Sequence, residues 1–144
     1  MNRLLPGLLL ATTAAAASAD SLAVADAWVR ATPPGATTGA AYLSITNHGP
    51  AADRLIGVRS DAAREVEVHT TVNEGGVMKM IRLDTLTVAS GETATLEPGG
   101  RHLMFMGLRK PFAPGDTIAV TLIFEQAGRI ELEIPVLDAR TKPQ

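Results

Sequence analysis

The chain contains no cysteine, and its aromatic residues are limited to one Trp, one Tyr and three Phe. Without cysteine there is no disulfide to stabilise the fold, no thiolate to ligate a metal and no cysteine for lipid attachment. With so few aromatic rings, the core must consist mainly of Val, Leu, Ile and Ala. A soft-metal site in this chain would have to use methionine sulfur.

Other absences narrow the range of functions that this chain can have. The formal net charge is −2 and the basic residues form no stripe, which argues against a nucleic acid as partner. The serine-nucleophile motif G-x-S-x-G, the zinc motif H-E-x-x-H and a phosphate-binding glycine loop are all missing. The carboxylates are scattered, so no acid–base pair can be assigned. We therefore expect a binding protein and not an enzyme.

The first residues have the features of a secretory signal peptide. Arg3 precedes an apolar stretch that runs from Leu4 to about Ala17, and Ala17-Ser18-Ala19 is a small-x-small cleavage site. The stretch is short for a bilayer span and contains Pro6, so a retained membrane anchor is the weaker alternative. We expect residues 1–19 to be the signal peptide and residues 20–144 to be one exported domain without stable membrane insertion.

Short β-rich runs alternate with turn signals along the remaining chain, which is typical of an all-β sandwich or barrel. Glycine- and proline-containing segments such as Pro33-Pro34-Gly35 and Pro98-Gly99-Gly100 separate the runs. No convincing amphipathic helix is present. The expected strands are 22–31, 40–47, 54–59, 65–70, 77–83, 93–96, 102–108, 117–124 and 129–136.

The alternation of residue types predicts how some strands are placed. In Glu65-Val66-Glu67-Val68-His69 the valines share one face, and the glutamates and His69 share the other. The run 117–124 is apolar on both faces, as expected of a central strand that is buried on both sides.

The methionines are concentrated in one window. Apart from the initiator, all four lie between Met78 and Met106, and two of the three histidines, His69 and His102, lie in or next to this window. Thioether sulfur and imidazole nitrogen together suit a soft monovalent ion, above all Cu(I). Methionine cannot form a disulfide, so such a site would suit an oxidising compartment.

The segment His102-Leu103-Met104-Phe105-Met106 reads as a strand with two distinct faces. Leu103 and Phe105 can fill the core, whereas His102, Met104 and Met106 lie on the opposite face, with neighbours roughly 7 Å apart. Two long side chains at that separation can converge on one ion. This segment is therefore the first candidate for a metal site.

A second segment can complete that site. His69 points away from the core valines, and a loop at 73–76 follows before Met78 and Met80. If this loop folds back, His69 and Met80 can approach His102 and Met104. Two imidazoles and two thioethers would form a neutral, four-coordinate site, which suits Cu(I) better than Cu(II) or Zn(II).

The spacing of these four residues, H-x10-M-x21-H-x-M, resembles the signature of the PCu(A)C family of periplasmic copper chaperones. The similarity covers essentially the whole chain after the signal peptide. Segments 40–47, 53–55, 76–80 and 98–108, and Gly115-Asp116 followed by a strand that ends at Phe124-Glu125, also look like this family.

The resemblance implies a cupredoxin-like Greek-key β-sandwich or barrel that binds Cu(I) at the matching residues His69, Met80, His102 and Met104. It implies delivery of copper in the periplasm toward cytochrome c oxidase assembly, commonly the CuA centre of subunit II, alongside Sco-type thiol proteins. Some relatives carry a His- and Met-rich C-terminal extension with a second copper site. This sequence ends without one, which argues for one copper per chain.

Purely structural interpretations of the same residues remain open. Methionine often fills a core, and Met106 is more easily read as a wall of the site than as a ligand. Met78 is similar and could serve as a spare ligand. Glu65 and Glu67 read as a solvated strand face, although one of them could orient His69.

Two remaining residues read as structural. His48, in an Asn-His-Gly-Pro turn, reads as a solvated turn residue. Trp28 is expected to serve in packing, with a position near the metal as the weaker reading.

Two other functions compete with a copper chaperone. One is a metal-free interaction module built on a β-sandwich, for which copper would not change stability. The other is an electron-carrying cupredoxin, but blue-copper sites require a cysteine thiolate, and the chain has none.

Overall fold

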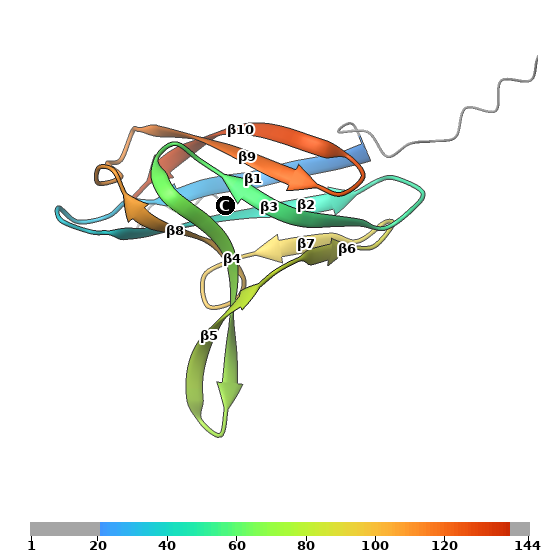
Figure 1. Ribbon diagram of the computed structural model, residues 1–144, viewed down its shortest axis with the longest axis horizontal. Coiled ribbons are helices and arrows are strands. Elements are labelled where there is room, and N and C mark those ends of the chain that lie inside the picture. Colours follow the sequence, from blue (N-terminus) through green and yellow to red (C-terminus); the bar gives the residue numbers. More distant parts are fainter. Residues whose placement is uncertain (1–20, 139–144) are drawn as a thin grey trace, which may run out of the picture.

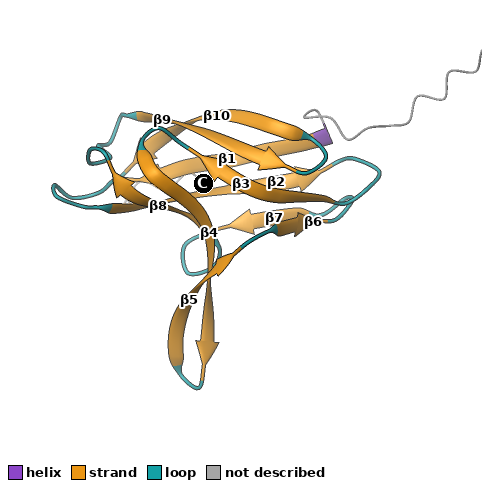
Figure 2. Ribbon diagram, viewed as in Figure 1, coloured by secondary structure: helices purple, strands orange, loops and turns teal. Residues whose placement is uncertain are grey.

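The computed structural model describes residues 21–138, so the expected signal peptide and the chain end after Asp138 lie outside the described residues. Within this range the chain forms ten strands (Figure 2). No helix in it is long and apolar enough to cross a membrane. The strands are β1 (Leu22–Arg30), β2 (Thr38–Asn47), β3 (Asp53–Arg59), β4 (Ala63–Glu74), β5 (Val77–Leu83), β6 (Leu86–Val88), β7 (Thr93–Leu96), β8 (His102–Leu108), β9 (Thr117–Phe124) and β10 (Gly128–Leu137).

Seven of the strands close into a barrel. Their order is β4-β8-β2-β1-β10-β9-β3, and the pairing of Val58 in β3 with Val66 in β4 closes the ring. Strand β6 pairs with β3, and β7 pairs with β2. The expected all-β, cupredoxin-like fold is therefore confirmed, and a closed barrel leaves few unpaired edges.

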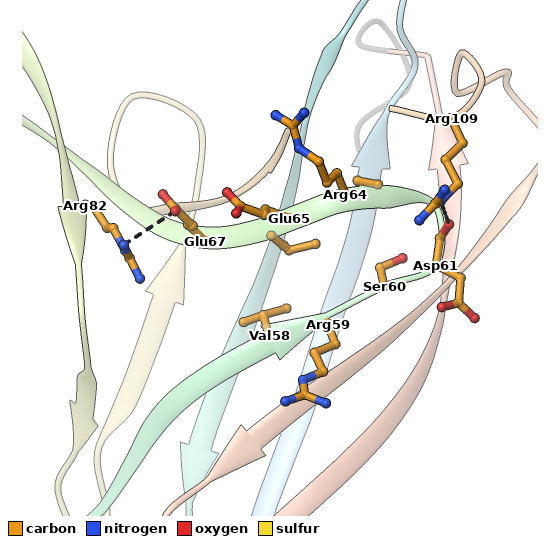
Figure 3. Close-up of a pocket in the computed structure, with 11 residues that line it drawn as sticks. Val58, Arg59, Ser60, Asp61, Arg64, Glu65, Glu67, Arg82 and Arg109 are labelled. Atoms are coloured by element: carbon orange, nitrogen blue, oxygen red, sulfur yellow. Dashed lines mark hydrogen bonds and ion pairs between the residues drawn. The ribbon is translucent and has the colours of Figure 1, made fainter. Parts of the chain in front are cut away.

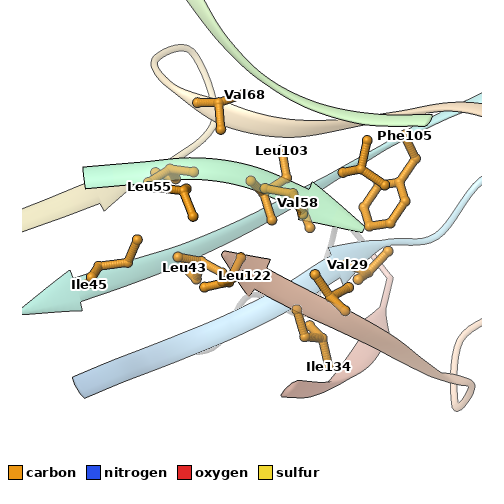
Figure 4. Close-up of a cluster of buried hydrophobic side chains, with 14 of the residues drawn as sticks. Val29, Leu43, Ile45, Leu55, Val58, Val68, Leu103, Phe105, Leu122 and Ile134 are labelled. Atoms are coloured by element: carbon orange, nitrogen blue, oxygen red, sulfur yellow. The ribbon is translucent and has the colours of Figure 1, made fainter. Parts of the chain in front are cut away.

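The core lies inside the barrel and is mostly aliphatic, as the composition predicts (Figure 4). Leu103 and Phe105 of β8 are fully buried, which confirms the predicted core face of that strand. The Phe105 ring packs edge-on against Phe112, with 5.2 Å between the ring centroids. Because β8 presents these two side chains inward, its alternate residues must face outward.

Two buried polar residues, Asn47 and Asp53, hold turns of the barrel. The Asn47 side chain donates to the carbonyl oxygens of Ala51 and Val88, and its Oδ1 accepts from the Gly49 amide. The Asp53 carboxylate accepts from the backbone amides of Arg54, Gln126 and Ala127. These bonds satisfy groups that would otherwise be costly to bury.

Most expected strands agree with the structure, and β5, β7, β8 and β9 have the expected bounds. Strand β6 was not expected, because a three-residue strand gives almost no periodicity. The expectation that 117–124 is buried on both faces is wrong. Ile118, Val120, Leu122 and Phe124 are buried, whereas the residues between them are exposed or half-buried, because a barrel strand has only one inner face.

Strands β4 and β5 form a hairpin that projects from the barrel (Figure 1). Its turn consists of Gly75 and Gly76, with φ values of 60° and 86°. Positive φ at both central residues is the requirement of a type I′ hairpin turn, which glycine meets without steric cost. The expectation that a loop at 73–76 folds back to bring Met80 to the site is therefore wrong: β4 continues to Glu74, and Met80 is positioned by strand pairing.

Candidate metal centre

Strand register gathers the four predicted ligands on the outer face of β5, β4 and β8. His69 pairs directly with His102, and Glu67 pairs with Met104. On the other side of β4, Thr71 pairs with Met80. Because directly paired residues point to the same side of a sheet, His69 lies beside His102 and diagonally from both methionines.

The His102 ring is buried and has one nitrogen available. The residue is only 7% exposed. Nδ1–H donates to the carbonyl oxygen of Gly100 at 3.3 Å, which leaves the lone pair of Nε2 free. Burial lowers the pKa of His102, the Gly100 hydrogen bond acts in the opposite direction, and the nearby His69 lowers it further. The ring is therefore neutral at pH 7, as a metal ligand must be.

The His69 ring is held by a carboxylate. Its Nε2–H donates to Oε2 of Glu67 at 2.8 Å, and Glu67 also lies 3.6 Å from Arg82. The other nitrogen, Nδ1, is buried without a hydrogen-bond partner among the described residues. A buried nitrogen with an unused lone pair is costly unless something binds it. The His69 and His102 ring centroids are 5.8 Å apart.

An open cavity of about 420 Å³ brings three of the predicted ligands together. Met80, His102 and Met104 line it, along with Arg30 and Tyr42 among others. His69 does not line the cavity itself, and its ring stands next to that of His102. Met80 is 54% exposed, whereas Met104 is half-buried, so the candidate centre opens to solvent on the side of β5.

The curvature of the sheet allows Met80 and Met104 to line the same cavity. Met80 and Met104 lie two strands and four residues apart in the register, which would separate their Cα atoms by about 17 Å in a flat sheet. Strand twist rotates the β4–β5 hairpin relative to β8. Both methionines consequently line one cavity.

The available donors fit a soft ion. They are two thioether sulfurs and two imidazole nitrogens without a hydrogen bond, Nδ1 of His69 and Nε2 of His102. None of these donors carries a charge, which matches Cu(I). Between residues 21 and 138, no three His, Asp or Glu side chains group as a metal site.

The structure also shows where the residues lie whose roles the sequence left undecided. Met78 is exposed on β5 and does not line the cavity. Met106 pairs with Glu65 and Thr38 but is not among the residues that line the cavity, so the expectation that it forms a wall of the cavity is wrong. His48 is exposed in its turn, as expected.

One feature of the centre was underestimated and one was missed. The main expectation that Glu67 is a solvated residue is wrong: its side chain is 19% exposed and holds His69, which agrees with the alternative that one of Glu65 and Glu67 orients this histidine. Arg30 at the cavity had no signal in the sequence, because β1 reaches this face only through its pairing with β2.

A second, larger hollow of about 690 Å³ lies between β3 and β4 (Figure 3). Figure 3 shows four arginines, Arg59, Arg64, Arg82 and Arg109, beside Asp61, Glu65 and Glu67. It contains neither sulfur nor imidazole. The chemistry of its side chains therefore does not suit a soft metal, and the smaller cavity is the better candidate centre.

Comparisons with known proteins find a family model, a curated relative and solved structures that are similar to this chain. The family model described as "Putative lipoprotein LpqE-like" matches residues 22–136. The "Putative lipoprotein Lxx21020" of Leifsonia xyli subsp. xyli is 36% identical over 121 residues, which cover 83% of this chain and 72% of that protein. Among solved structures, the copper-bound PCuAC domain from PmoF2 matches with a TM-score of 0.71 and 28% identity, over 82% of this chain and 93% of that domain. The Cu(I) form of DR1885 from Deinococcus radiodurans matches with a TM-score of 0.68 and 29% identity, over 90% of this chain and 86% of that protein.

Proposed function

Because the chain belongs to the PCu(A)C family, through its LpqE-like model, we propose that it is a copper chaperone that binds one Cu(I) and transfers it to a recipient protein. The proposed ligands are His69, Met80, His102 and Met104. The copper is cargo, so the role is binding and transfer and not catalysis. Similar domains have been solved with copper bound, which supports the metal but not the individual ligands.

The observation that carries the proposal is the unused nitrogen of His69. Glu67 accepts a hydrogen bond from Nε2–H of His69, so Nδ1 is left buried with a free lone pair and no partner among the described residues. The neighbouring His102 is fixed by Gly100 in a similar way. Carboxylate and carbonyl acceptors that fix the ring orientation are typical of metal-ligating histidines.

The exposure of the ligands suggests how copper leaves. His102 is buried, whereas Met80 is mostly exposed on the projecting hairpin. A neutral thioether binds more weakly than a thiolate, so a thiolate of the recipient can replace Met80 first. Transfer then proceeds by exchanging one ligand at a time, and the imidazoles are released last.

We place this transfer outside the cytoplasm. Residues 1–19 act as the signal peptide and residues 20–144 as the copper-binding domain, which is exported to the periplasm. The proposed recipient is subunit II of cytochrome c oxidase, at its CuA centre, or a Sco-type thiol protein. A lipoprotein family model is consistent with export.

Copper X-ray absorption on the Cu(I)-loaded protein tests the ligand set. Two sulfur and two nitrogen scatterers are expected, and an oxygen-dominated shell would contradict the assignment. Transfer is tested separately, by mixing the loaded protein with a copper-free CuA domain and following the CuA absorption bands. Copper that stays on this chain in the presence of excess recipient would refute the chaperone role.

A further inference from the structure

The lining of the cavity that contains Met80 and Met104 carries one positive charge, that of Arg30. The Arg30 guanidinium lies 5.5 Å from the ring centroid of Tyr42 and 5.9 Å from that of Trp28. The two rings pack against each other with 4.8 Å between their centroids. Guanidinium groups bind favourably over aromatic faces, so these rings fix Arg30 in place at the cavity.

This charge is not balanced within the described part of the chain. Nε of Arg30 is buried without a hydrogen-bond partner, and no ion pair to Arg30 occurs among residues 21–138. No Asp or Glu lines the cavity. A buried N–H without an acceptor carries a desolvation cost, which an anion in the cavity would remove.

Neighbouring groups would help to hold such an anion. Thr32 and Thr38 line the same cavity. Oγ1 of Thr32 accepts from the Phe112 amide, so its own hydrogen remains available to donate. A guanidinium fork and a hydroxyl donor are the groups that recognise a carboxylate.

We propose that this cavity binds the carboxylate of a small organic anion at Arg30, next to the candidate copper ligands. A volume of about 420 Å³ falls within the usual range for small-molecule sites. Trp28 and Tyr42 position the guanidinium, Nε and the terminal nitrogens donate to the carboxylate, and Thr32 donates to its free oxygen. Anion binding requires no copper, so it can be tested separately from the chaperone role.

The location also couples the anion to the metal. Cu(I) in a neutral ligand set adds one positive charge to a cavity that already contains Arg30, so it strengthens the attraction for an anion. By linkage, the anion strengthens Cu(I) binding by the same factor. Loss of the anion would then weaken copper binding.

The test titrates the copper-free protein with sodium acetate in place of sodium chloride at constant ionic strength. The Arg30 Nε–H resonance is expected to shift on acetate and not on acetamide, which is neutral and of similar shape. Trp28, the only tryptophan, contacts Arg30 and Tyr42 and gives an independent fluorescence signal. Arg30→Gln should weaken the response about tenfold or more, and Arg129→Gln, an exposed control on β10 with the same charge change, should leave it unchanged.

Three results would overturn the inference. These are a resonance that does not move with acetate, equal responses to acetate and acetamide, and equal losses in the two variants. Arg30→Lys, which retains the charge without the fork, should show partial binding if Arg30→Gln disturbs packing. In the Cu(I)-loaded protein acetate should bind at least threefold more tightly, and an unchanged affinity would refute the proximity of the two sites.

Discussion

Replacing the two proposed sulfur ligands, Met80 and Met104, by leucine is expected to remove tight Cu(I) binding and leave the fold intact. Leucine has nearly the volume of methionine, so such exchanges usually change stability by less than about 1.5 kcal/mol. Met80 is exposed and Met104 is half-buried, which places the double variant at the low end of that range. The effect should therefore be on the metal and not on the barrel.

The magnitude follows from sharing the binding energy among four ligands. Structural four-ligand metal sites bind with about 10–16 kcal/mol, or roughly 3 kcal/mol per ligand if the ligands contribute equally. Losing one sulfur should then weaken Cu(I) about a hundredfold, and losing both about ten-thousandfold. Neither sulfur accepts a hydrogen bond among the residues that the structure describes, so replacing them breaks no hydrogen bond in the copper-free protein.

Competition with a chromophoric Cu(I) chelator measures these affinities. Thermal unfolding with and without Cu(I) provides a second readout, because a ligand that binds only the folded state stabilises it by about 4 kcal/mol at a thousandfold excess over Kd. This copper-dependent increase in Tm should be present in the parent protein and absent from the double variant.

The chain offers a matched control in Met78 and Met106. Both methionines lie on the same two strands and the same face as the proposed ligands, and neither lines the cavity. Their double leucine variant should bind Cu(I) as the parent does. If it loses as much affinity as the Met80/Met104 variant, the methionines act as a general sulfur-rich surface and the proposed site is wrong.

Three further predictions address positioning, protonation and packing. Glu67→Gln should weaken Cu(I) binding about 10–100-fold, because an amide cannot fix the proton of His69 as a carboxylate does; chelator competition measures this, and no change would exclude a positioning role. The copper-free protein should lose stability as pH falls through about 6.5, because the lowered pKa of His102 lets the unfolded chain take up a proton before the folded one. Urea unfolding at several pH values checks this, and His102→Gln should flatten the dependence. Gly39→Ala should destabilise the barrel by about 1–3 kcal/mol, since a Cβ there would lie 2.8 Å from the buried Phe112 ring; an unchanged Tm would contradict it.

Much of the fold could be predicted because alternation on a strand has a direct physical cause. Leu103 and Phe105 had to face inward if His102 and Met104 faced outward, and the structure agrees. The second half of β4 could not be foreseen as a strand. Residues 70–74 are half-buried or exposed, so no core-facing pattern marks them, and the pairing with β5 alone extends the strand.

Part of the candidate centre could likewise be predicted from the sequence, and part of it could not. The four predicted ligands could be selected by donor type and by their spacing, and their assignment as ligands stays a prediction. The contact of Glu67 with His69 required the rotamers of both side chains. The position of Arg30 required the long-range pairing of β1 with β2 and of β2 with β8, which local sequence does not encode.

The projecting hairpin has a consequence for the energetics of metal exchange. Residues 77–82 of β5 are all exposed, so fraying of this arm exposes almost no additional apolar surface and does not disturb the barrel interior. Amide hydrogens of β5 should exchange at a free-energy cost far below that of the barrel strands. Opening of the arm would separate one sulfur from the other three donors without unfolding the protein, so the lifetime of bound copper would be set by a local equilibrium that a docking partner can shift.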